Sequence, residues 1–405
     1  MIIKKCRVCN SRSLKKLFSL GKMKFTGKFP KKNQFTPSGN VNLVMCKKCR
    51  LVQLKDNFNL KYLYNSDYGY RTGINATMRN HVKHVVKKIT KKAKLKDNDY
   101  VLDIASNDGT LLNYYKKNLN TFGIDPLINK YKKNYKDITY KVADFFNHNN
   151  INKIDKSIKF KAITALSVFY DLKNPQVFLK DIKKILHKEG IFNLEFADLK
   201  LIIKNNMFDT ICHEHLEYYS VTLINNLLKS AGLRIFDHNY NEINGGSSSY
   251  FICHDESKLK TNRKIAIILR NEKKLKLHSF NTYKYFKKRI DKIKKDLVKL
   301  LLKLKKQKKI IHGYGASTKG NVLLQYFNID HRHIDYISDR NPKKNNCFTP
   351  GSNIKIITEA KSRSLKPDYY LVLPWHFKQE ILKREKKIRS KGTKFIFPLP
   401  KINII

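Results

Sequence analysis

Apolar and polar residues alternate along the chain in blocks that predict strands, turns and helices. The apolar run YVLDI at 100–104 is followed by the polar turn ASNDG, and a second run, TFGI at 121–124, ends in Asp125. Between the two runs, TLLNYYKKN is amphipathic and predicts a helix. A strand, a tight turn, a helix and a strand that ends in a carboxylate are typical of the start of a doubly wound parallel sheet, in which ligands bind at the carboxyl ends of the strands.

The alternation predicts further elements as far as residue 254. Strands are expected at 140–146, 160–172 and 190–198, with a helix at about 175–187. Ser220 is a suitable cap for a helix that ends at Gly232. The next segment, 233–254, predicts a hairpin that turns at its paired glycines.

A second, smaller α/β unit is predicted after a lysine-rich helical stretch at about 256–309. Residues 308–329 again read as a strand, a glycine turn and a helix. The turn GYGASTKG has Thr318 in place of the third glycine of a dinucleotide-binding finger, and it is no P-loop because Lys319 precedes Gly320. The turn ASNDG likewise keeps only one of the usual three glycines. Neither turn identifies a nucleotide by itself, but both open an α/β unit.

Two CxxC pairs stand near the N-terminus, Cys6 with Cys9 and Cys46 with Cys49. Four thiolates close a tetrahedral shell around zinc and leave no open coordination position. Seven cysteines are few for this length, and this usage suits a metal in a reducing compartment better than disulfides. The sequence therefore predicts a zinc ion that holds the fold and takes no part in the chemistry.

The segment FDTICHEHLEYYS at 208–220 places two histidines around a glutamate, His213-Glu214-His215. A zinc-protease HExxH motif needs its second histidine four residues after the first, where this chain has Glu217. Two interpretations stay open on the residues alone. The segment is an acid/base site, because a histidine titrates near neutrality and a buried glutamate can approach it, or it is a polar loop before a helix.

The chain of 405 residues carries a formal charge of +52, from 84 Lys+Arg against 32 Asp+Glu. The basic residues are spread along the whole chain, mostly as lysine among asparagine and isoleucine, which favours a compositional bias over a nucleic-acid surface. Alternatively, the positive charge attracts a phosphorylated small substrate. No stretch approaches the roughly 18 apolar residues of a membrane helix, and we expect a cytoplasmic protein with no membrane partner.

Taken in order, the motifs resemble those of one family, the class I S-adenosylmethionine (SAM)-dependent methyltransferases of the nucleotide-sugar C-methyltransferase type. The resemblance runs through nearly the whole chain. It rests on CRVC, CKKC, DYGYRTG, VLDIASNDGTLL, SVFYDL, FDTICHEHLEYYS, NEINGGS, HGYGASTKGN, SDRNPKK with the later TPG, and LVLPW. It implies an α/β fold with a Rossmann-like SAM methyltransferase domain, a small N-terminal zinc-binding domain and a C-terminal Rossmann-like domain.

The resemblance also implies which residues bind ligands. The SAM pocket is expected around Asp103, Asn107 and Gly109, with Ala105 in the same turn, and Asp125 is expected to hold the ribose. The turn with Gly315, Ser317 and Lys319 is expected to help hold a nucleotide-sugar substrate.

In relatives that methylate C3 of 4-keto-6-deoxy sugars, acid/base duty falls to the Glu-His of HEH, to a tyrosine before the first strand and to a histidine after strand four. Glu214 and His215 match the first pair, and Tyr68 or Tyr70 matches the tyrosine. Two positions depart from the family: Cys212 stands where these enzymes commonly carry tyrosine, and Tyr170 lies near their strand-four histidine. We expect His215 to remove the C3 proton of a 4-ketosugar and Glu214 to orient His215. Tyr170 or Tyr68 is expected to polarise the carbonyl group of the sugar.

The expected division of the chain is a zinc-binding domain at 1–65, a methyltransferase domain at 66–255, a helical linker at 256–307 and a nucleotide-sugar-binding domain at 308–405. Two other functions remain open. An RNA methyltransferase would explain the charge together with the zinc knuckles, although a nucleic-acid partner is not favoured. A zinc-stabilised nucleotide-binding module without catalysis would explain why the first turn, ASNDG, keeps only one glycine.

Overall fold

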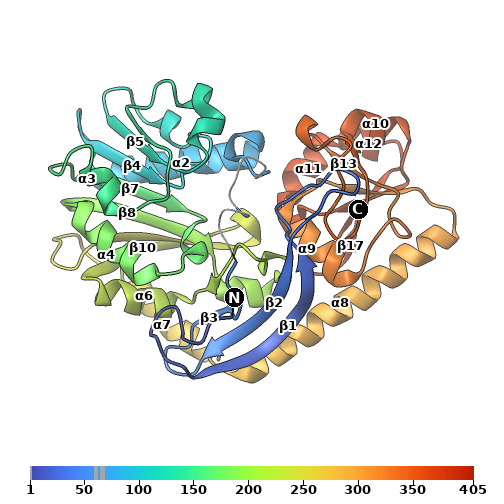
Figure 1. The fold of residues 1–405 in the computed structure, drawn as a ribbon, viewed down its shortest axis with the longest axis horizontal. Helices are drawn as coiled ribbons and strands as arrows, with labels where there is room; N and C mark the ends of the chain where they lie inside the picture. Colours follow the sequence, from blue (N-terminus) through green and yellow to red (C-terminus); the bar gives the residue numbers. More distant parts are fainter. Residues whose placement is uncertain (1, 59–62, 64–68) are drawn as a thin grey trace.

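The computed structural model describes residues 2–58, 63 and 69–405, and its strands form three sheets (Figure 1). Two lobes built on α/β sheets stand side by side, and a long curved hairpin runs beneath them from one lobe to the other (Figure 1). The fold class expected from the sequence is confirmed. The division of the chain at residues 65, 255 and 307 stays a prediction.

The central sheet has seven strands in the order β10-β11-β8-β7-β4-β5-β6. Their bounds are β4 Tyr100–Ile104, β5 Asn120–Ile124, β6 Tyr140–Val142, β7 Phe160–Leu166, β8 Leu186–Ala197, β10 Leu233–Asn241 and β11 Ser247–His254. The strands from β6 to β8 pair in parallel, and β11 pairs antiparallel with both β8 and β10. The order reverses between β4 and β7, and in open α/β sheets ligands bind at such a switch point.

Helices accompany this sheet and the hairpin after it. They are α2 Ala76–Ala93, α3 His148–Asn152, α4 Pro175–Ile185, α5 Leu199–Lys204 and α6 Val221–Ser230. The cap expected at Ser220 is present, because its side chain accepts a hydrogen bond from the backbone of Leu223. β7 is buried along most of its length, as expected of a strand covered on both faces.

One predicted element is wrong. Instead of a helix over TLLNYYKKN, the chain makes a short 3-10 turn, Leu112–Tyr114, before it enters β5. Successive turns, closed by the backbone N–H of Tyr115 on Leu112 and of Leu119 on Lys116, replace the helical ladder. Leu112 and Tyr115 are buried, so the apolar residues of this segment contact the core from a compact loop.

The third sheet has six strands in the order β14-β13-β12-β15-β16-β17, parallel except for β17. Its strands are β12 Ile311–Tyr314, β13 Tyr336–Asp339, β14 Ile356–Thr358, β15 Tyr369–Val372, β16 Lys394–Phe397 and β17 Asn403–Ile404. Its helices are α9 Thr318–Phe327, α10 Glu359–Ser364, α11 Lys378–Arg384 and α12 Lys386–Arg389. The order again reverses beside the first strand, between β12 and β15, which gives a second switch point.

The N-terminal sheet has the order β1-β2-β3-β9, with β1 Leu14–Lys24, β2 Ser38–Cys46, β3 Val52–Leu54 and β9 Glu217–Tyr218. β9 belongs in sequence to the segment that carries HEH, so this segment joins a sheet built from the start of the chain. The lysine-rich stretch forms α7 Lys264–Lys274 and α8 Phe280–Lys306. The long helix α8 runs under the hairpin of β1 and β2 (Figure 1) and contacts it through Phe286, whose ring centroid lies 5.8 Å from that of Phe18.

Across residues 2–58, 63 and 69–405, we find no helix that combines the length and the apolar character of a membrane span.

Candidate active site

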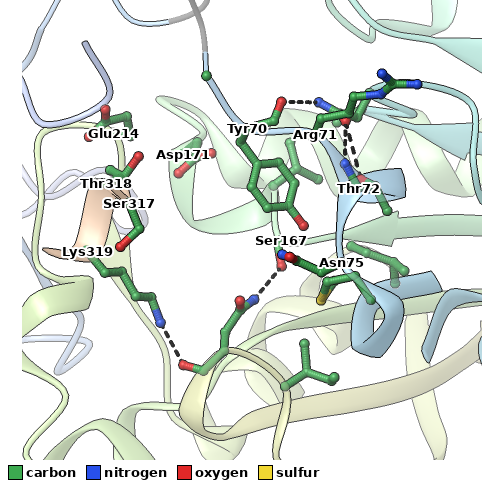
Figure 2. Close-up of a pocket in the computed structure, with 18 of the residues that line it drawn as sticks. Tyr70, Arg71, Thr72, Asn75, Ser167, Asp171, Glu214, Ser317, Thr318 and Lys319 are labelled. Atoms are coloured by element: carbon green, nitrogen blue, oxygen red, sulfur yellow. Dashed lines mark hydrogen bonds between the residues drawn. The ribbon is translucent and has the colours of Figure 1, made fainter. Parts of the chain in front are cut away.

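A cavity of about 610 Å³ lies between the two α/β units, where the carboxyl ends of both parallel sheets meet. The first unit contributes Asp103 and Asp125, and the C-terminal unit contributes Gly315 and Asp339. His215 lines the same cavity. Figure 2 shows how side chains from both units, and from the segment that carries HEH, face this space. The two predicted ligand turns therefore open onto one site.

The wall from the first unit is built around two buried carboxyls. Asp103, at the end of β4, accepts a hydrogen bond from the Thr164 hydroxyl at 2.6 Å, and burial raises its pKa to about 7. Asp125, just after β5, accepts the backbone N–H of Asn107 at 2.9 Å and of Leu127 at 2.7 Å. Burial raises the Asp125 pKa to about 6, against these two bonds.

The turn between β4 and β5 uses left-handed backbone at residues other than glycine. Ala105 has φ 57° and Asn107 has φ 51°, and both line the cavity. Gly109 is not among the lining residues. Its φ is +72°, and a Cβ on it would meet Ile138 at 3.0 Å and Tyr135 at 3.2 Å. Gly109 therefore packs the turn against the core, and its expected place on the ligand wall is not seen.

The wall from the C-terminal unit repeats this arrangement. Asp339, at the end of β13, accepts the backbone N–H of Ala316 at 2.7 Å and of Asn341 at 2.8 Å. Asp125 makes the same two kinds of bond, one to the turn after the first strand and one two residues downstream of itself. Each carboxylate oxygen keeps one free lone-pair direction after these bonds. Both acids are thus held ready to accept hydrogen bonds from a ligand.

The second glycine turn is tight because other segments press on it. Gly315 has φ +80°, and a Cβ there would lie 2.8 Å from the ring of Pro374. Ser317 caps α9 by accepting the N–H of Gly320. Lys319 donates from Nζ to the carbonyl oxygen of Asn244 at 2.6 Å, which ties the C-terminal unit to the hairpin of the first (Figure 2). All three predicted substrate residues line the cavity.

The three residues of HEH point in different directions. His213 is buried against the N-terminal unit, with its ring centroid 4.8 Å from those of Phe25 and Phe58. Glu214 and His215 line the cavity. The interpretation as an ordinary polar loop does not account for two titratable side chains facing an open cavity.

Hydrogen bonding fixes the tautomer of His215. Its Nδ1 lies 2.7 Å from the carbonyl oxygen of Thr210. A carbonyl oxygen only accepts, so Nδ1 carries the proton and Nε2 of the neutral ring keeps a lone pair. Burial, helped by the charge of Lys319, lowers the His215 pKa to about 3, so the ring is neutral at physiological pH. Thr210, and not Glu214 as expected, orients this imidazole.

Two of the three candidate tyrosines face the site, and Tyr68 lies outside the described residues. The ring of Tyr170 packs on His215 with 4.1 Å between centroids. Burial raises the pKa of Tyr170 well above its usual value, which keeps the phenol protonated as a donor. Tyr70 stands in the middle of the cavity (Figure 2), and its side chain is 39% exposed there.

The four N-terminal cysteines form a cluster that fits zinc. Their sulfur atoms all lie within 4.8 Å of one another, and the Cys6–Cys49 and Cys9–Cys46 sulfurs are 3.5 Å apart. A tetrahedral site with Zn–S bonds of about 2.3 Å places its sulfurs about 3.8 Å apart. Among the described residues, no second group of His, Cys, Asp or Glu has metal-binding spacing, so HEH is not supported as a metal site.

Comparison with known proteins decides the family. Three family models match in succession: a zinc binding domain at residues 6–64, a methyltransferase domain at 74–238 and a C-methyltransferase C-terminal domain at 242–400. A curated relative, the C-methyltransferase NovU of Streptomyces niveus, is 26% identical over 408 residues, which cover 100% of this chain and 97% of NovU. The chain is a SAM-dependent C-methyltransferase.

Two solved structures are similar to this C-methyltransferase over less than half of its length. One is a SAM-dependent methyltransferase of Clostridium acetobutylicum, 15% identical, covering 44% of this chain and 92% of its own, with a TM-score of 0.36. Another is the magnesium protoporphyrin IX methyltransferase of Synechocystis with bound S-adenosylhomocysteine, 13% identical, covering 46% and 90%, with a TM-score of 0.34.

The predicted family, the methyltransferase activity, SAM as cofactor and the structural zinc site are confirmed for this C-methyltransferase. The residues present fit SAM. The free lone pairs of Asp125 suit two ribose hydroxyls, and the buried carboxyl of Asp103 suits a cationic group.

Several residues of the cavity were not singled out from the sequence. They are Asn75, Thr210, Asn244, Asp339, Arg340, Lys344 and His376. Asp339 had a usable signal, because it ends the strand after the second glycine turn as Asp125 does after the first. Thr210 and Asn244 had none, since their roles depend on contacts made only by the folded chain.

Proposed function

We propose that this C-methyltransferase transfers a methyl group to C3 of a nucleotide-linked 4-keto-deoxysugar through an enolate. One observation carries the proposal. Two nucleotide-type walls, one around Asp125 and one around Asp339, face a single cavity that also contains His215. Such a cavity suits a reaction between SAM on one wall and a second nucleotide on the other.

The C-terminal wall is proposed to bind the nucleoside diphosphate part of the nucleotide-sugar. Asp125 is proposed to accept the ribose hydroxyls of SAM, and Asp339 those of the substrate. Four cations, Lys319, Arg340, Lys344 and Arg384, line this wall. The last three pair with carboxylates of the same wall: Arg340 with Glu380, Lys344 with Asp339 and Arg384 with Glu359. Lys344 donates to the carbonyl of Ala316 at 2.6 Å and so stands at the turn itself. These cations favour a ligand with phosphate groups.

His215 is proposed as the base. The C3 proton moves to its free Nε2, and the electron pair of the C–H bond moves into the enolate that forms with the 4-keto group. The charge of this enolate raises the His215 pKa from its low value, because burial opposes an imidazolium only until an anion lies beside it. The proton gained by Nε2 and the negative oxygen thus stabilise each other in the transition state.

Tyr170 and Tyr70 are proposed to donate to the oxygen of the enolate. Tyr170 packs directly on the base, and its phenol stays protonated at physiological pH. When bound, SAM supplies the methyl group that the enolate carbon accepts. Residues of both walls hold the two reactants at short range, which supplies much of the rate in a two-substrate reaction.

Glu214 is proposed to contact the sugar. Its Oε2 accepts a weak hydrogen bond from the Thr26 hydroxyl at 3.4 Å. Its Oε1 is buried and has no hydrogen-bond partner within the described residues. A buried carboxylate oxygen without a donor is costly, and a sugar hydroxyl would satisfy it.

Proton exchange tests the base. A nucleotide-linked 4-keto-6-deoxy sugar is incubated with the enzyme in heavy water without SAM, and deuterium at C3 is followed by NMR. We expect exchange by the native protein and none by His215→Ala. Tyr326→Phe, at a residue that does not line the cavity, serves as the control and should exchange normally. Exchange that survives in His215→Ala would remove His215 as the base.

A further inference from the structure

The segment that carries Glu214 and His215 is built into the N-terminal sheet. Two residues after His215 the chain forms β9, which pairs antiparallel with β3 so that Val52 faces Tyr218 and Gln53 faces Glu217. The backbone N–H of Leu54 also donates to the carbonyl of Leu216 at 2.9 Å. Leu216 is thus held from two sides, because its own N–H donates to the carbonyl of Tyr170 at 2.8 Å while its carbonyl accepts from β3. A strand of another unit therefore shares in setting the position of His215.

β3 is bonded in turn to the cysteine knuckles. Gln53 is fully buried, and its Nε2 donates to Cys6 Sγ at 3.3 Å. Arg7, inside the first knuckle, donates from Nη1 to the carbonyl of Leu54 at 2.6 Å and from its backbone N–H to Gln53 Oε1 at 3.2 Å. Polar bonds at this depth are costly to break, because the groups left behind have no water to replace their partners.

The N-terminal unit reaches Glu214 from a second side as well. Thr26, in the link between β1 and β2, donates to Glu214 Oε2 at 3.4 Å. The neighbouring Gly27 lies so close that a Cβ on it would stand 2.7 Å from Glu214 Oε1. Thr26 is itself held by Asn321 of α9, whose Nδ2 donates to the Thr26 carbonyl at 2.7 Å.

We infer that the cysteine knuckles and β3 are a positioning device for the catalytic segment, and that Gln53 and Thr26 are the positioning residues through which it acts. Zinc held by the four thiolates would keep the two knuckles together. Gln53 and Arg7 transmit that order to β3, and β3 fixes β9 and the two residues before Leu216. Loss of this order moves Glu214 and His215 without touching the SAM wall. The inference rests on the proposed roles of those two residues.

Hydrogen exchange of the full-length protein tests the device independently of catalysis. Deuterium uptake of the peptide 211–220 is compared between native protein, protein from which a chelator has removed the zinc, and the Gln53→Leu variant. We expect exchange at Glu217–Tyr218, the residues paired with β3, to accelerate at least tenfold after zinc release and several-fold in Gln53→Leu. Ser19→Ala, on β1 of the same sheet, is the matched control and should leave this peptide unchanged.

Two further readouts separate positioning from unfolding. Calorimetric titration with SAM should give a Kd within about twofold of native for zinc-released protein, because the SAM wall belongs to another sheet. Unchanged exchange after verified zinc release would overturn the inference, and so would a parallel collapse of SAM binding. A native protein that transfers no methyl to any ketosugar would remove the proposed function and leave the exchange result standing.

Thr26 gives a second test that does not depend on metal. Thr26→Val keeps the side-chain shape and removes the hydroxyl that contacts Glu214, whereas Thr26→Ser keeps the hydroxyl. We expect kcat to fall about tenfold in Thr26→Val, with zinc content and SAM affinity unchanged, and to recover in Thr26→Ser. Equal kcat in the two variants would show that the hydroxyl does not position Glu214.

Discussion

The two carboxylates that mirror each other across the cavity lead to one prediction with a built-in control. Asp125→Asn replaces one of two acceptor oxygens by an NH2 group, which faces a backbone N–H in either orientation and accepts no hydrogen bond from a ribose hydroxyl. A hydrogen bond to a charged group is worth about 1.5–3 kcal/mol. Loss of one such bond to the ribose raises the SAM Kd roughly 10- to 150-fold.

Asp339→Asn makes the same chemical change in the same backbone setting, on the opposite wall. It should leave the SAM Kd within about twofold and raise the KM for the nucleotide-sugar by a similar factor of about 10 to 150. Calorimetry with SAM and steady-state methyl transfer measure the two quantities. The reasoning is refuted if Asp125→Asn binds SAM as tightly as native protein does, or if Asp339→Asn is the variant that loses SAM.

Three further outcomes are expected. The raised Asp103 pKa of about 7 means that Asp103 of the free protein is protonated at lower pH, whereas cationic SAM favours the ionised carboxylate. SAM affinity should therefore rise from pH 5.5 to 7.5, and calorimetry in two buffers should detect the proton that is released. Asp103→Asn should flatten this pH profile. Tyr170→Phe should lower kcat about 100-fold at unchanged SAM Kd, as loss of one donor to a developing oxyanion does. Lys319→Met should destabilise the fold by about 2 kcal/mol in urea denaturation, because it removes a buried charged hydrogen bond and leaves Asp209 without a nearby cation; an added Asp209→Asn should restore part of the loss.

The predicted fold held wherever one segment carried its own signal. The strands β4, β5, β7 and β8, the cap at Ser220 and the two glycine turns follow from local apolar runs and turn residues. The helix expected over TLLNYYKKN is absent, although the apolar residues of this segment are buried as the pattern implied. Leu112 and Tyr115 reach the core from a loop instead of from a helix. Periodicity alone does not distinguish these two cases in a segment this short.

The candidate site shows the same limit. Asp103, Asp125 and the C-terminal turn were expected to bind ligands mainly from the family resemblance. Their positions agree with the general rule that residues at the ends of parallel strands meet at one edge of the sheet, and all three line the cavity. The Thr210 bond that fixes the tautomer of His215 was not predicted, nor was the pairing of β9 with β3. Both depend on how separate segments pack. β9 in particular is a two-residue strand and leaves no periodic trace in the sequence.

The identity of the methylated atom tests the central claim most directly. The protein is incubated with SAM carrying a 13C-labelled methyl group and a panel of nucleotide-linked 4-keto-6-deoxy sugars, and the product is examined by mass spectrometry and NMR. The account predicts one added methyl group bonded to C3, with loss of the C3 proton. A methyl group on oxygen or nitrogen, or transfer to RNA with none to any ketosugar, would contradict it.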